Sequence, residues 1–119
     1  MKAVIKAMWV DSPDIILDSY RPDDLGFFGL WINLRIGPDD SEGAHDYQLL
    51  VCSPNWLKSE CISVGVLWGR HMLIVNEYDI YSIKDEISKC INSYSGEEWG
   101  EVAKKIARFA AWEYEDYKV

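Results

Sequence analysis

The clearest structural signal in this 119-residue chain is the segment Phe27-Phe28-Gly29-Leu30-Trp31-Ile32-Asn33-Leu34-Arg35-Ile36. Apolar residues recur at every second position from Phe28 to Ile36, which is the period of a β-strand with one buried face. The opposite face is mixed, because it carries Trp31, Asn33 and Arg35. We therefore predict a strand over residues 27–36, whose mixed face could be covered by a helix, a second subunit or a binding partner.

Three further segments with strand character flank this one. Each has a face that recurs at every second position. In residues 2–10 this face is Ala3, Ile5, Ala7 and Trp9, in residues 46–52 it is Tyr47, Leu49 and Val51, and in residues 69–75 it is His71, Leu73 and Val75. Between the second and third strands, residues 37–43 form a strong turn signal of glycine, proline and acidic side chains. The strands on either side of this turn are predicted to form an antiparallel hairpin.

The C-terminal third is predicted to be helical. Apolar residues recur at helical spacing after Asp79, and again after Ser95 and Glu98, which match a capping box. A short helix is also predicted to begin after Ser53. Since strands come first and helices last, we predict an α+β fold: an antiparallel sheet of about four strands with two C-terminal helices packed on one face, in a single domain over residues 1–119.

The charge balance excludes several partner classes. Acidic residues outnumber basic ones by 20 to 12, which gives a formal net charge of −8. Nucleic acids and anionic membranes attract clustered Lys and Arg, so we expect neither as a partner. The chain shows no signal-peptide pattern and no long apolar segment, and its three cysteines contain no CxxC pair. We therefore expect a cytoplasmic protein without a disulfide framework, metal or other cofactor.

The negative charge is concentrated in the first half of the chain and at its end. Residues 11–46 carry −7 of the total, and the closing segment 112–117 alternates aromatic and acidic side chains. Such segments either keep a small domain soluble or attract a basic partner. The candidate partner-binding residues are Asp23, Asp24, Asp39, Asp40, Glu42, Asp46, Trp112, Glu113, Tyr114, Glu115 and Asp116.

Catalytic signals are weak. We predict that His45 is a solvated turn residue and that His71 is a structural or interface residue, since no cysteine is placed beside it as a nucleophile. Neighbouring acids such as Asp39 and Asp40 lack any sign of the apolar pocket that acid–base catalysis requires. The chain is therefore predicted not to be an enzyme.

Four segments share their pattern with one known family. They are Asn33–Pro38, Val51–Leu57, Trp68–Val75 followed by Tyr78, and the closing helix from Gly96 to Tyr117. In these segments the chain resembles the immunity protein 8 family of bacterial polymorphic-toxin and contact-dependent growth inhibition systems. The resemblance implies a small cytoplasmic protein that binds and neutralises the C-terminal domain of a cognate toxin.

The resemblance also divides the motif residues by expected role. Trp68, Gly69 and Met72 are expected to pack in the scaffold, whereas Arg70 and His71 are the motif positions expected to have polar roles. Toxins of such systems are often nucleases, and an acidic inhibitor could cover their basic substrate-binding face. The alternative is a non-inhibitory acidic adaptor domain, and the oligomeric state is left open.

Overall fold

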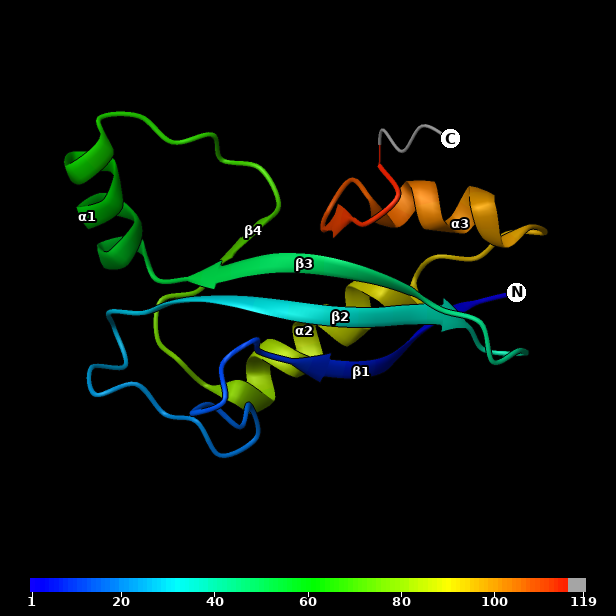
Figure 1. Cartoon of the computed structure of the whole chain (residues 1–119), viewed down its shortest axis with the longest axis horizontal. Coiled ribbons are helices and arrows are strands. Elements are labelled where there is room, and N and C mark those ends of the chain that lie inside the picture. Colours follow the sequence, from blue (N-terminus) through cyan, green and yellow to red (C-terminus); the bar gives the residue numbers. More distant parts are fainter. Residues whose placement is uncertain (116–119) are drawn as a thin grey trace.

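The strand predicted from residues 27–36 is β2 (Gly29–Pro38), and it lies between β1 (Ala3–Trp9) and β3 (His45–Cys52). The computed structural model describes residues 1–115 and pairs both neighbours antiparallel to β2. Figure 1 shows these three strands side by side along the long axis of the molecule. The predicted hairpin of β2 and β3 is therefore confirmed, with Leu34 opposite Tyr47.

The other edge of β3 has two partners, and they correct the predicted sheet. β4 (Met72–Ile74) pairs parallel to the end of β3, and β5 (Ala111–Trp112) pairs antiparallel to its beginning. Within residues 1–115 the sheet is thus mixed and has five strands, so the prediction of a purely antiparallel sheet of about four strands is wrong. The parallel pair forms because α1 (Pro54–Val64) and the connection after it return the chain to β3 in the same direction.

The fold has the two predicted C-terminal helices and, before them, the short helix predicted after Ser53. α2 (Ile80–Asn92) begins at Asp79, whose side chain accepts hydrogen bonds from two backbone N–H groups. α3 (Trp99–Ile106) begins after Glu98 without a side-chain cap, so the predicted capping box does not form. The short helix predicted after Ser53 is thus confirmed as α1, whereas the fold class of two C-terminal helices is wrong in helix count and placement, because α1 lies between β3 and β4.

One hydrophobic core joins the sheet to α2 and α3. It contains the alternating apolar residues of β2 and β3 and one face of each of these helices: Leu30, Ile32, Leu34, Ile36, Leu49, Val51, Ile83, Ile87, Ile91, Val102 and Ile106. Full burial of such a side chain stabilises the fold by about 1.5–3 kcal/mol. The alternation read in β2 therefore identifies the buried face, and it leaves Trp31 and Arg35 exposed on the opposite face.

Among residues 1–115, no helix has the length and apolar character that crossing a membrane requires.

Candidate functional site

The acidic residues predicted to bind a partner lie at two opposite ends of β2. Asp23 and Asp24 lie in the connection that precedes the strand, whereas Asp39, Asp40 and Glu42 lie in the loop that follows it. The ten residues of β2 span roughly 33 Å at about 3.3 Å each. The structure therefore does not bring these two segments together (Figure 1).

The described part of the C-terminal acidic segment, residues 112–115, packs against the beginning of β3, at the end of the sheet where a loop connects β2 to β3. The backbone N–H of Asp46 donates to Glu113 Oε1 at 2.8 Å, and the N–H of Glu113 donates to the Asp46 carbonyl at 3.1 Å. The Glu115 carboxylate accepts a hydrogen bond from Arg70 Nη2 at 2.6 Å. Asp116, the last predicted site residue, lies outside the described residues.

Some of the predicted carboxylates already have partners within the chain. Asp46 accepts two hydrogen bonds from Arg35, at 2.9 Å from Nε and 3.1 Å from Nη2. These contacts raise the pKa of the Arg35 guanidinium, first through the hydrogen bond and then through the charge of Asp46. Arg35 also lies 5.0 Å from the centre of the Trp9 ring, so it is fixed from two sides.

Three predicted carboxylates are available for a partner. Within the described part of the chain, the side chains of Asp23, Asp40 and Glu42 form no hydrogen bond or ion pair, and all three residues are exposed. Asp24 instead accepts a hydrogen bond from the Gly26 N–H, and Asp39 accepts one from the Lys2 N–H. An unpaired carboxylate can bind a cation without giving up an existing contact.

The prediction that His45 is a solvated turn residue is wrong, because it lies half-buried in an aromatic cluster. The indole N–H groups of Trp99 and Trp112 both donate to His45 Nδ1, at 3.3 and 3.1 Å. The Tyr114 ring lies 4.9 Å from the imidazole. Trp112 and Tyr114, predicted to bind a partner, therefore help to anchor the C-terminal segment to β3.

Arg70 and His71 both form polar contacts within the chain, and the contacts of His71 are with α3 and β3. Its ring Nε2 donates to the Ala107 carbonyl at 2.9 Å, and its own carbonyl accepts the Leu50 N–H at 3.0 Å. His71 adopts φ 59°, a conformation that is uncommon for a residue with a side chain. The backbone of His71 thus redirects the chain at the start of β4, and its side chain links this point to the C-terminal end of α3.

Trp68 contradicts its expected packing role, because its side chain is 91% exposed. It belongs to an exposed apolar set that the sequence reasoning missed, which we call the α1 patch: Ile62, Val64, Val66 and Trp68. Every member is more than half exposed, and α1 itself has no fully buried residue. The sequence contains a signal for this set, since apolar residues occupy every second position from 62 to 68. Within the described residues, none of these four belongs to a strand of the sheet.

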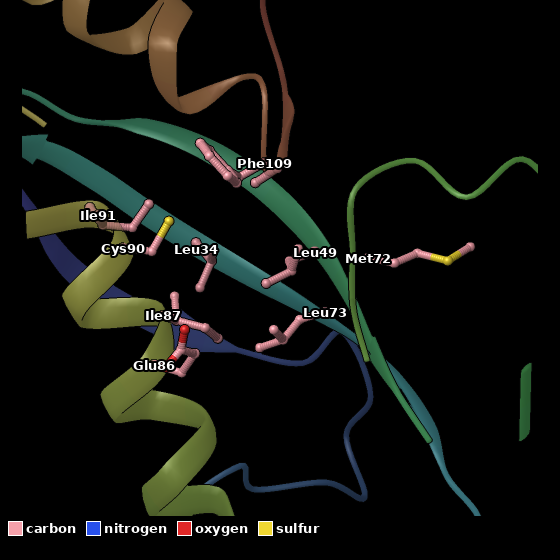
Figure 2. A pocket seen from close by; sticks show the side chains of 10 residues that line it. Leu34, Leu49, Met72, Leu73, Glu86, Ile87, Cys90, Ile91 and Phe109 are labelled. Carbon is pink, nitrogen blue, oxygen red and sulfur yellow. The ribbon is translucent and has the colours of Figure 1, made fainter. Parts of the chain in front are cut away.

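An apolar groove of about 240 Å³ lies between α2 and the sheet. Figure 2 shows Leu34 and Leu49 from the strands facing Ile87 from the helix, with Glu86 and Cys90 beside it. Burial, followed by the charge of Glu86, raises the pKa of the Cys90 thiol, so the nucleophilic thiolate is disfavoured. Among the described residues, no group of His, Cys, Asp or Glu side chains could hold a metal ion.

Tyr47 connects this sheet to α3 and supplies a pH prediction. Its hydroxyl donates to the Ala103 carbonyl at 3.1 Å, and burial raises its pKa well above the ordinary value of 10. Above about pH 10 the unfolded chain releases this proton while the folded chain keeps it. The contribution of Tyr47 to the free energy of unfolding is therefore fully present below that pH and decreases as the pH rises. We expect Tyr47→Phe to lower the free energy of unfolding by about 1 kcal/mol at neutral pH, because the hydrogen bond to Ala103 is lost. Between neutral and alkaline pH, the variant should lose less of this free energy than the wild type does.

Urea unfolding of the wild type and of Tyr47→Phe from about pH 8 to about pH 11 measures how much stability each protein loses in alkali. The remaining tyrosines are common to both and act as the internal control. Equal losses of stability in the two proteins would contradict the assignment to Tyr47.

A comparison with protein-family models agrees with the sequence resemblance. The family model described as Immunity protein 8 matches residues 3–117. Comparisons with curated proteins and with solved structures give no match. Because the matched region includes every helix and strand of the fold, the chain belongs to the immunity protein 8 family.

Proposed function

We propose that this chain neutralises a nuclease toxin by covering the basic face on which the toxin binds its substrate. Membership of the family implies an immunity protein whose partner is a cognate toxin. Nucleases hold phosphates with Arg and Lys, and carboxylates form charge-assisted hydrogen bonds with the same side chains. A chain with net charge −8 can therefore exclude the nucleic acid by occupying its binding face.

The observation that supports this proposal most directly is the set of exposed, unpaired carboxylates. Asp23, Asp40 and Glu42 project from loops and have no partner in the described part of the chain. A toxin cation can bind them without breaking an intramolecular ion pair. Their combined field would also attract a basic surface over a distance and speed association.

Co-expression with the toxin domain encoded directly upstream is expected to restore growth of the host cell. The purified chain should stop that domain from degrading nucleic acid at a one-to-one ratio. An oligonucleotide that resists cleavage should compete with the chain for the toxin, because both would occupy the same basic face. Raising the salt concentration to about 0.5 M should slow association at least tenfold, to about the rate of uncharged partners.

Each failure has a separate meaning. A toxin that stays active in the presence of the chain would contradict an inhibitory function, and a stable complex without growth rescue would favour the adaptor alternative. A complex that still binds the oligonucleotide would contradict occlusion of the substrate face, while leaving immunity itself in place.

A further inference from the structure

We propose that the toxin docks on the α1 end of the molecule, with the α1 patch as the apolar centre of the interface and Asp23 and Asp24 as its charged border. This inference rests on the proposed function and selects one of the two acidic ends as the binding site. The occupant would be the cognate toxin domain, through an apolar surface bordered by Lys or Arg.

The first support is the exposure of the α1 patch. Ile62, Val66 and Trp68 are between 74% and 91% exposed, although they lie within seven consecutive positions. Ile62 and Val64 lie two positions apart in α1 and project from different sides of the helix, so the α1 patch lies around the C-terminal end of α1 rather than along one helix face. Single exposed apolar side chains are normal on a soluble protein, whereas several at one end of an element are typical of an interaction site. Tryptophan is also among the residues that most often dominate binding energy, because it buries roughly 150–250 Å².

A second group of aromatic side chains extends this surface onto the sheet. Trp56 of α1 lies directly on the backbone of Gly29, the first residue of β2. Phe27 and Trp31, two positions to either side of Gly29, are 44% and 50% exposed. The apolar surface therefore continues from α1 to the beginning of β2.

The acidic connection before β2 reaches the same place. The Asn55 side chain of α1 donates a hydrogen bond to the Gly26 carbonyl, and Gly26 in turn donates its N–H to the Asp24 carboxylate. Figure 1 shows α1 and this connection at one end of the sheet, and the β2–β3 loop at the other. Asp23 and Asp24 consequently border an apolar surface.

The α1 end has the composition expected of an interface. Residues 54–69 contain a single basic and a single acidic residue, Lys58 and Glu60, so the surface is nearly uncharged at its centre and acidic at its border. Interfaces commonly combine an apolar centre, depleted of charge, with a polar rim. The β2–β3 loop lacks this combination, because residues 39–44 contain no large apolar side chain.

Two pairs of matched variants test this inference against the toxin domain encoded directly upstream. Trp68→Ala is compared with Phe109→Ala, which removes a 45% exposed ring between α3 and β5, away from the α1 end. Asp23→Lys is compared with Glu97→Lys, which changes an exposed carboxylate that has no partner among the described residues and lies just before α3. Urea unfolding first shows that all variants fold as the wild type does. Surface plasmon resonance with the immobilised toxin domain then measures dissociation constants and association rates.

We expect Trp68→Ala to weaken binding about thirtyfold or more, and Asp23→Lys to slow association about fivefold or more. Phe109→Ala and Glu97→Lys should stay within about twofold of the wild type. If the wild type binds the toxin and Trp68→Ala binds equally well, the docking site is wrong while the proposed function stands. If the wild type does not bind, the proposed function and this inference fail together.

Sedimentation of the free protein tests the rival occupant, a second copy of this chain. The wild type is expected to be monomeric at micromolar concentration. A dimer that Trp68→Ala dissociates would overturn the inference, because the α1 patch would then be a contact between copies.

Discussion

Replacing Gly37 with alanine is expected to destabilise the fold by about 3 kcal/mol, the upper end of the usual cost of overpacking. Gly37 is a buried residue of β2, and a Cβ atom there would lie 2.0 Å from the carbonyl oxygen of Gly43. The neighbouring Ala44 Cα would lie 3.1 Å away. Because the obstacle is backbone, no side-chain rotation can relieve the clash.

The β2–β3 loop also has little freedom to move away. Lys6 Nζ donates hydrogen bonds to the carbonyls of Ser41 and Gly43, which fix the loop against β1. Displacing the loop enough to admit a methyl group would therefore cost these contacts as well. The change should disturb the position of Asp39, Asp40 and Glu42 together.

Gly43→Ala in the same loop is the matched control. A Cβ atom at Gly43 would meet nothing within 4 Å, so we expect this variant to stay within about 0.5 kcal/mol of the wild type. Urea unfolding monitored by circular dichroism measures both free energies. Equal unfolding midpoints for the two variants would show that β2 and the loop do not approach as closely as described.

Replacing Gly29 with alanine is expected to cost about 2–3 kcal/mol and to displace α1 from the sheet. A Cβ atom there would lie 2.1 Å from Cε2 of Trp56 and 2.4 Å from two further atoms of the indole. The obstacle is a side chain in this case. The clash should therefore disappear when Trp56 is shortened.

A double-mutant cycle measures this coupling. Trp56→Ala alone should destabilise the protein by the loss of its packing, and adding Gly29→Ala to it should cost about 1 kcal/mol or less. The two changes should thus couple by more than about 1 kcal/mol. Additive effects would mean that the indole does not rest on Gly29, and that the continuity between α1 and the sheet in the proposed interface is absent.

The elements with strong local signals could be predicted from the sequence. Alternation identified β2 and its buried face, because a half-buried strand repeats every two residues. Helix capping was also readable: Ser53 accepts the Trp56 N–H at 3.3 Å, and Asp79 caps α2. These signals act within a few residues, so they need no knowledge of the rest of the chain.

The short edge strands could not be predicted in this way. β4 has three residues and β5 has two, which is too few for a period to be recognised. Their pairing depends on where α1 and α3 deliver the chain relative to β3. The mixed character of the sheet is therefore a property of the tertiary structure.

In the candidate site too, exposure could be predicted from the sequence, whereas contacts between elements could not. The sequence correctly marked Asp23, Asp40 and Glu42 as exposed acidic residues, since charged side chains in turns remain solvated. It could not tell that Asp46 is paired with Arg35, or that Trp112 donates to His45. Those contacts join residues from different elements.

The family, the acidic character and the central hairpin of this protein can be recognised from the sequence, because motif pattern, charge and alternation are local features of neighbouring residues. The tertiary structure alone decided which carboxylates remain unpaired, which end of the sheet carries exposed apolar side chains, and that Trp68 faces solvent. The physical reason is that burial and pairing depend on segments distant in sequence. A tryptophan in a motif packs only if another element covers it, and no described element covers Trp68.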